Sequence, residues 1–193
     1  MGFQTGTVTF SGLGDLIIDT GATLNLDGSD TVQVDLINNG TVNAFNTSNS
    51  ITGAVTNPAG STINIDSTGG FFGALTVSNG FTNAGTIVLD NQSTTGHDSS
   101  LTVSSGTLAN TGTLQTRDTG SLVGEHNITA QITNTGLIDI DQNTVLNNNT
   151  RTFNSTAGTI DVETGEIFRI ERGTFAVGTG TVLQGGEIGR AHV

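Results

Sequence analysis

The sequence predicts an all-β, single-domain protein folded as a parallel β-helix, a solenoid with about three strands in each coil of about 20–27 residues. The first observation is a frame that recurs along the chain, as in Phe81-Thr82-Asn83-Ala84-Gly85-Thr86-Ile87-Val88-Leu89. The second is the absence of amphipathic helical segments between its copies. The third is the near-regular spacing of the glycine that anchors each copy: Gly40, Gly60, Gly85, Gly112, Gly136, Gly158 and Gly180. A repeat of this length buries its apolar face only against its neighbours, as solenoid repeats do.

Short alternating segments are the predicted strands. In the N-terminal part they are 7–10, 16–18, 23–26 and 32–36, separated by Gly, Asp and Ser. In the coil that begins after Gly85 they are 86–89, 101–103 and 107–109. Alternation with a period of two is typical of strands that have one buried face. The longer segments 91–100 and 117–126 are expected to be loops, which a solenoid accommodates without disturbing its stack.

Apolar residues at fixed offsets predict columns inside the coils. Two inward residues follow each corner: Val42 and Ala44, Ile63 and Ile65, Ile87 and Leu89, Ile138 and Ile140, Ile160 and Val162. One more precedes each corner: Leu36, Val55, Phe81, Leu108, Ile132, Phe153 and Phe175. On successive coils about 4.8 Å apart, these residues would stack into continuous hydrophobic columns.

Asparagine recurs beside the corner glycine. Four copies have it two residues before the glycine, at Asn38, Asn83, Asn110 and Asn134, and Asn57 lies three residues before Gly60. Stacked amides can hydrogen-bond from coil to coil, which satisfies polar groups that a buried corner would otherwise leave unpaired. The last two copies have Thr156 and Gly178 instead, so we expect the ladder to end there.

Composition excludes several partners. The net charge is −12 and the five basic residues are scattered arginines, so no basic patch could bind nucleic acid or anionic lipid. No apolar run approaches the roughly 20 residues of a membrane helix, and residues 1–5 do not resemble a signal peptide. The absence of cysteine fits both the cytosol and exported bacterial proteins.

The last six residues are predicted not to belong to the natural protein. Ile188-Gly189-Arg190-Ala191-His192-Val193 matches the translation of a common short-read sequencing adapter, and a GAG codon for Glu187 would supply the bases with which that adapter begins. We therefore assign residues 1–187 to the repeat domain, as a fragment of a longer protein from environmental reads, and 188–193 to a tail with no reason to pack.

The run Ser100-Leu101-Thr102-Val103-Ser104-Ser105-Gly106-Thr107-Leu108-Ala109-Asn110-Thr111-Gly112-Thr113-Leu114 resembles the β-strand repeats of bacterial autotransporter passengers and filamentous haemagglutinin-like adhesins. The resemblance covers nearly all of residues 7–187. It implies a right-handed parallel β-helix that is secreted or attached to the bacterial cell surface. Such proteins are often stalks that present an adhesive or enzymatic element. We expect this segment to be a structural or adhesive stalk and not an enzyme, with an unknown host or cell-surface ligand, such as a carbohydrate, as its partner. Uncapped solenoid ends also predict end-to-end self-association.

A β-helical polysaccharide lyase or hydrolase is the alternative, because such enzymes place carboxylates and basic groups on one outer face. The candidate charged groups are His97-Asp98, Arg117-Asp118, Glu125-His126 and Arg169-Ile170-Glu171-Arg172. We interpret them as solvated surface charge, because no known catalytic motif includes them. An ice-binding surface would need ranks of Thr-x-Thr, and Thr7-x-Thr9 is isolated.

Four acidic residues form one further candidate site. Counted from Gly136 and Gly158, Asp139 and Asp161 share one outward position on adjacent coils, and Asp141 and Glu163 share the next. Oxygen ligands at this spacing suit Ca²⁺, so a weak calcium site is a hypothesis and no other cofactor is expected. A solvated acidic face is the simpler interpretation.

Overall fold

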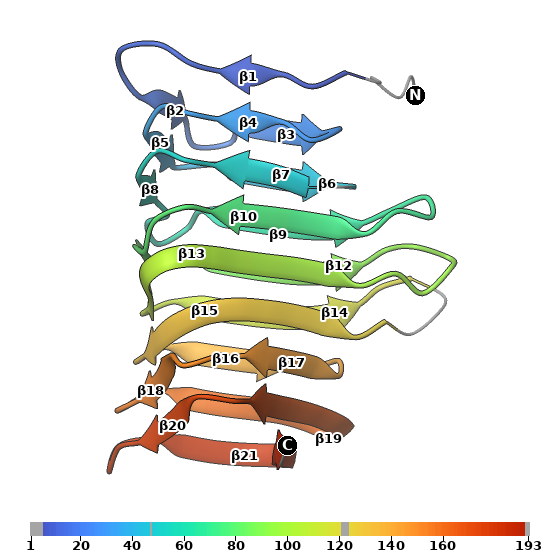
Figure 1. Ribbon diagram of the computed structural model, residues 1–193, viewed down its shortest axis with the longest axis vertical. Coiled ribbons are helices and arrows are strands. Elements are labelled where there is room, and N and C mark those ends of the chain that lie inside the picture. The colour runs from blue at the N-terminus through green and yellow to red at the C-terminus, as the bar shows by residue number, and fades with distance from the viewer. Residues whose placement is uncertain (1–5, 47, 121–123, 192–193) are drawn as a thin grey trace.

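The computed structural model describes residues 6–46, 48–120 and 124–191 and confirms the predicted fold class. The chain forms a parallel β-solenoid of about eight turns, with no helix in the described residues. The coils stack along one axis, with the two ends of the chain at opposite ends of the stack (Figure 1). No helix in these residues is long and apolar enough to cross a membrane.

Each full coil contributes three strand positions. The position after the corner comprises β3 (Thr23–Asp27), β6 (Thr41–Phe45), β9 (Thr62–Ser67), β12 (Thr86–Asn91), β14 (Thr113–Asp118), β16 (Leu137–Ile140) and the first parts of β19 (Thr159–Glu171) and β21 (Val182–Ala191). The second comprises β1 (Thr9–Phe10), β4 (Thr31–Val32), β7 (Ser48–Ile51), β10 (Gly73–Val77), β17 (Thr144–Asn147), the first parts of β13 (Ser99–Asn110) and β15 (His126–Asn134), and the second parts of β19 and β21. The third comprises β2 (Leu16–Ile18), β5 (Leu36–Asn38), β8 (Val55–Thr56), β11 (Phe81–Asn83), β18 (Thr152–Ser155), β20 (Thr174–Val177) and the ends of β13 and β15.

All pairings between coils in the described residues are parallel, and the first strand position keeps its register from coil to coil. Thr41 pairs with Thr62, Thr62 with Thr86, and Thr86 with Thr113, so equivalent residues lie side by side along the stack. The predicted strands 101–103 and 107–109 are merged in β13, with a shift in register between Thr102 and Thr107. β13 and β15 pair at both the second and the third strand positions, and β19 and β21 pair at both the first and the second. The hydrogen bonds therefore join the strands into one 18-stranded sheet and a separate sheet β2-β5-β8.

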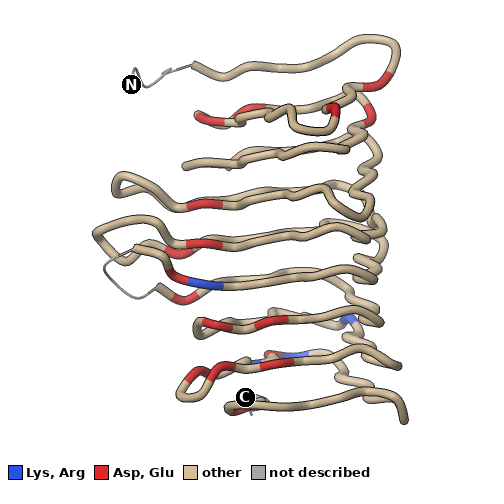
Figure 2. Tube along the Cα trace, turned by 180° about the vertical axis from the view of Figure 1, so that it is seen from behind, with Lys and Arg blue, Asp and Glu red and all other residues tan. Residues whose placement is uncertain are grey.

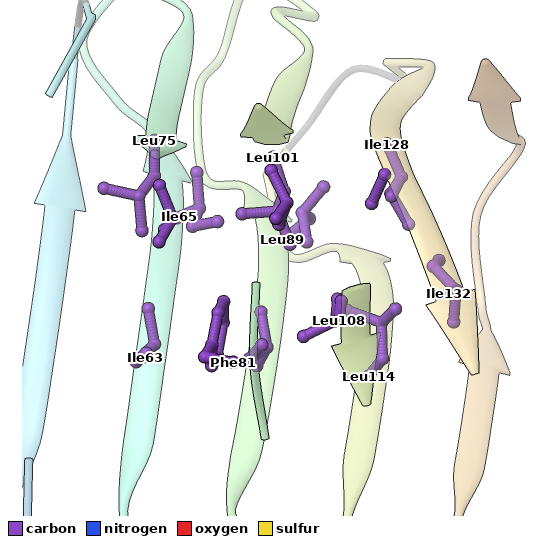
Figure 3. Close-up of a cluster of buried hydrophobic side chains, with 14 of the residues drawn as sticks. Ile63, Ile65, Leu75, Phe81, Leu89, Leu101, Leu108, Leu114, Ile128 and Ile132 are labelled. Atoms are coloured by element: carbon purple, nitrogen blue, oxygen red, sulfur yellow. The ribbon is translucent and has the colours of Figure 1, made fainter. Parts of the chain in front are cut away.

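The hydrophobic core is the set of predicted columns. Figure 3 shows Ile63, Ile65 and Leu75 in one coil beside Leu89 and Leu101 in the next. The inward residues that follow the corners are buried from Val42 to Val162, and those that precede them are buried from Leu36 to Phe153. These side chains form a single cluster that extends through the stack, which explains how a chain with short strands and no disulfide maintains one fold.

Asparagine side chains form a buried ladder along the corner. Each amide nitrogen donates to the side-chain oxygen of the next asparagine: Asn38 to Asn57 at 2.9 Å, Asn57 to Asn83 at 2.7 Å, Asn83 to Asn110 at 2.8 Å and Asn110 to Asn134 at 2.8 Å. The same nitrogens also donate to backbone carbonyls of the following coil, as Asn83 does to Thr113 at 2.9 Å. The ladder ends at Ser155, whose Oγ lies 3.5 Å from Asn134 Nδ2. Ser155 pairs with Asn134, so it occupies the position predicted for Thr156.

Most corner glycines are required by close approach of the previous coil. A Cβ on Gly85 would lie 2.5 Å from the carbonyl oxygen of Pro58, and one on Gly112 would lie 2.1 Å from that of Gly85. The prediction that Gly60 and Gly180 occupy the same corner position as the other glycines is wrong. The residues that begin the following strands, Thr62 and Val182, come two residues after these glycines rather than one. Ser61 and Thr181 therefore occupy the equivalent corner position, and Gly60 adopts a φ of 88° in the extra residue of its turn.

The end of the chain differs from the prediction that 188–193 has no reason to pack. β21 continues through Ala191 and pairs residue by residue with the second half of β19, from Ile167 with Glu187 to Glu171 with Ala191. Ile188 packs against the hydrophobic core. Residues 192–193 lie outside the described residues. The edge of β19 presents a row of backbone N–H and C=O groups, with which a following segment can pair whatever its origin.

Candidate functional site

Most of the charged groups noted in the sequence meet along one edge of the solenoid, whereas Arg172 lies in the turn between β19 and β20. We call this the loop edge. On this side, loops 68–72 and 92–98 connect the first strand position to the second, and residues 119–120 and 124–125 lie at the same point of the next coil. These connections project on one side of the stack in Figure 1. In Figure 2, acidic segments of the middle coils lie toward the same edge. The loops interrupt the alternation of the strands, so polar residues at their bases need partners from neighbouring coils.

Two acids and one base form a column at the loop edge. Asp66 of β9 pairs in register with Asp90 of β12, and Asp90 pairs with Arg117 of β14. Arg117 Nε lies 3.0 Å from Asp90 Oδ2, and the backbone N–H of Thr119 donates to Asp90 Oδ1 at 3.0 Å. Asp66 and Asp90 are only 3% and 1% exposed. The single arginine therefore neutralises Asp90, and Asp66 has no cation of its own.

Burial, followed by the neighbouring carboxylate of Asp90, raises the pKa of Asp66 to about 7. The charge of Arg117 and a hydrogen bond with Gln92 act in the opposite direction but do not cancel these effects. Two carboxyl groups with such different environments are what acid–base catalysis uses. Here, however, both carboxyl groups are covered, so a polysaccharide could not reach them.

A Ser-His-Asp set also lies behind this column. His126, which is 0% exposed, has Nε2 at 3.1 Å from Asp118 Oδ1 and 2.9 Å from the carbonyl oxygen of Arg117. Its Nδ1 accepts a hydrogen bond from the backbone N–H of Ser99 at 3.3 Å. The Ser99 hydroxyl instead donates to the carbonyl oxygen of Asp90 at 2.6 Å. Among the described residues no base contacts that hydroxyl, so the set ties two neighbouring coils together rather than activating a nucleophile.

The remaining charged candidates are surface ion pairs. Arg169 lies 3.1 Å from Glu125 and 2.9 Å from Glu171, with side chains that are about a third or more exposed. Asp98 accepts a hydrogen bond from the backbone N–H of Glu125 at 2.9 Å. Pairs of this kind contribute little to stability, about 0–1 kcal/mol each, in line with their interpretation as solvated charge.

Two exposed phenylalanines end loop 68–72, directly before β10. Phe71 and Phe72 are 52% and 57% exposed. The ring of Phe72 meets His97 of loop 92–98 edge to face, with centroids 4.7 Å apart. The two loops therefore contact each other through this pair of rings.

The structure brings together only part of the proposed calcium site. Asp139 and Asp161 pair in register and Asp141 shares a hydrogen-bond donor with Asp139, whereas Glu163 is exposed. Gln115 Nε2 donates to both Asp139 and Asp141 at 2.9 Å, and Gln184 Nε2 donates to Asp161 at 2.8 Å. Burial, followed by the nearby charge of Asp141, raises the pKa of Asp139. Within the described residues, no three acidic or histidine side chains are arranged to share a metal ion.

Sequence reasoning missed Asp66 and Asp90 because it searched for charged residues adjacent in the chain. Each lies four residues after the first residue of its strand, as Arg117 and Asp141 do, so comparing equal offsets would have found them. Comparisons with known protein families, with curated proteins and with solved structures find no match to this chain. The geometry of the chain itself is therefore the basis for assigning a function.

Proposed function

We propose that this chain is a rigid stalk segment of a large secreted or surface-attached bacterial protein of the adhesin or autotransporter-passenger type. The observation that carries the proposal is the unbroken register of the first strand position. It runs from Thr23 to Val182 through seven successive parallel pairings. A continuous hydrogen-bonded stack with a continuous core resists bending, which suits a spacer that holds another element away from a surface.

The outer faces fit a structural role better than a catalytic one. Outward residues form ranks of short polar side chains, such as Asn25, Asn43 and Asn64, whose amides are linked from coil to coil at 2.8 Å. The acid pair at the loop edge is buried, and the more exposed Arg169 is paired with Glu125 and Glu171. The rival function, a carbohydrate-active enzyme, needs acids and bases that converge in an open groove.

End-to-end self-association is part of the proposal for the 193-residue polypeptide. At one end of the stack, a hollow of about 200 Å³ is lined by residues that include Ile170, Phe175 and Leu183. At the other end, Phe10 and Leu16 line a hollow of about 220 Å³. Both hollows are open ends of the same interior, so the first coil of one copy could continue the columns of the last coil of another.

The stalk function is tested by a distance measured along the axis. Thr20 and Thr179 are exposed and precede β3 and β21, so cysteines there can carry two dyes in a chain with no other cysteine. Seven coil spacings of about 4.8 Å place the labelled positions about 34 Å apart along the stack. Single-molecule energy transfer should give one narrow distance distribution, and a broad one would contradict a rigid spacer.

A depolymerisation assay separates the stalk from the enzyme. Neutral and acidic polysaccharides incubated with the protein should show no loss of viscosity, no new reducing ends and no unsaturated products. Activity that disappears in the Asp90→Asn variant would favour the enzyme and overturn the proposal.

A further inference from the structure

Two loops begin next to the buried carboxyl pair. Asp66 is followed after one residue by loop 68–72, and Asp90 is followed after one residue by loop 92–98. Loop 68–72 closes on Asp66, because a Cβ on Gly73 would lie 2.5 Å from the Asp66 carbonyl carbon. Any change at the Asp66 carboxyl group therefore acts where the first loop leaves and rejoins the solenoid.

The two loops are joined through the neighbour of Asp66. Ser67 Oγ donates to the carbonyl oxygen of His97 at 2.9 Å, and the backbone N–H of Gln92 donates to the carbonyl oxygen of Ser67 at 3.0 Å. The backbone N–H of Ser67 also donates to Ser99 Oγ at 3.2 Å. Together with the ring contact between Phe72 and His97, these bonds make the two loops a single unit that begins next to Asp66.

The charges that surround Asp66 are unbalanced. On one side, β6 presents Phe45, which pairs with Asp66 and is not ionisable. On the other side, β12 presents Asp90, whose charge is already paired with Arg117 of β14. Loop 92–98 contributes the Gln92 amide, near the Asp66 carboxyl group, and His97, which contacts Phe72. An ionised Asp66 would thus be a buried charge beside a second one, without a cation in direct contact.

We propose that Asp66 is a proton-controlled latch: when protonated it holds loops 68–72 and 92–98 closed on the loop edge, and on losing its proton it releases them. Release would break the contact between Phe72 and His97 and increase the exposure of Phe71 and Phe72. The latch changes the aromatic surface at one side of the stack, whereas the core columns and the asparagine ladder remain intact.

The direction of the pH dependence follows from the number of protons that Asp66 binds in the closed and open states. Released into water, Asp66 has the ordinary pKa of 3.8, whereas burial in the closed state raises that pKa to about 7. Between these values the closed state holds one more proton, so the fraction of open loops should rise about tenfold per pH unit. Below about pH 4 and above about pH 7 the fraction of open loops no longer changes with pH, because both states then hold the same number of protons. The latch is therefore tighter under mildly acidic conditions than at neutral pH.

Hydrogen exchange of the full chain, followed by mass spectrometry between pH 5 and 8, tests the latch. After correction for the intrinsic exchange rate, protection of residues 66–73 and 91–99 should fall about tenfold per pH unit up to about pH 7 and then level off. Asp66→Asn, which keeps the size and removes the charge, should stay protected throughout. Asp15→Asn, a change at an exposed acid of the first turn, should behave as the wild type does.

Two further variants identify the group that controls the loops. Asp90→Asn removes the neighbouring negative charge, so its transition should shift to lower pH. His97→Gln should keep the pH dependence, because Asp66 and not His97 controls the opening of the loops. The proposal is overturned if the wild type shows no slope, if Asp66→Asn keeps it, if His97→Gln removes it, or if Asp90→Asn leaves the transition where it is.

Discussion

Replacing Asn110 with Ala should be among the most destabilising single changes in this protein. The buried Asn110 amide donates to Asn134 Oδ1 at 2.8 Å and to the Leu137 carbonyl oxygen at 2.9 Å, and its oxygen accepts from Asn83 Nδ2 at 2.8 Å. The substitution removes three hydrogen bonds, and each buried partner left unpaired costs about 1–3 kcal/mol. We expect the free energy of unfolding to fall by about 3–9 kcal/mol, a large part of the roughly 5–15 kcal/mol of an ordinary domain.

Urea denaturation followed by circular dichroism measures this loss, and Asn64→Ala provides the matched control. Asn64 makes the same kind of amide bond between coils, to Asn43 at 2.8 Å, but on an outward face of the solenoid. Water replaces that partner, so its loss should cost less than about 1 kcal/mol.

The ladder should also show coupling between neighbours. Asn83→Ala and Asn110→Ala remove the same hydrogen bond, so their double mutant should be more stable than the sum of the single effects predicts, by about 0.5–3 kcal/mol. Asn38→Ala and Asn110→Ala share no bond and should be additive. Equal costs for Asn110→Ala and Asn64→Ala would refute the argument that burial makes the ladder important.

Four other outcomes are expected. Ile87→Ala leaves a cavity in the buried column and should cost about 2–5 kcal/mol in urea denaturation, whereas Thr86→Ala should cost far less; similar costs would contradict the assigned register. Gly112→Ala places a Cβ 2.1 Å from a backbone oxygen and should lower the melting temperature more than Gly60→Ala, whose Cβ meets open space although its φ is 88°. If Asp139 and its neighbours bind Ca²⁺ weakly, saturating calcium should raise the melting temperature above that in chelator, and identical curves would remove the site. Light scattering should show an apparent mass that rises with concentration as ends associate, and a constant monomer mass would contradict end-to-end association.

Much of the architecture could be predicted because a solenoid repeats one physical solution. Inward residues such as Ile63 and Ile87 recur at the same offset, and parallel pairing converts equal offsets into contact. The same logic located the asparagine ladder. It failed at Gly60 and Gly180, because a turn with one extra residue moves the glycine away from the corner while the strand keeps its register.

The loop edge was harder to predict than the core. A loop of any length can join two stacked strands, so the sequence does not reveal that loops 68–72 and 92–98 contact each other. Burial of Asp66 is equally hidden, because its position in the strand faces outward and is covered only by those loops. Its raised pKa is a consequence of tertiary contacts, which alternation in the sequence cannot indicate.

The asparagine ladder also gives the molecule an internal direction. Every amide donates toward the C-terminal coil, and Asn38 Oδ1 accepts the backbone N–H of Gly40 at 3.2 Å, which fixes the orientation of the first member. Turning one amide over would set two donors or two acceptors against each other, so the whole row must keep a single orientation. The row is bounded by Ile18 in the coil before Asn38 and by Val177 in the coil after Ser155. The aligned amides thus behave as a finite one-dimensional chain of dipoles, in which the orientation at one end is transmitted, coil by coil, to the other.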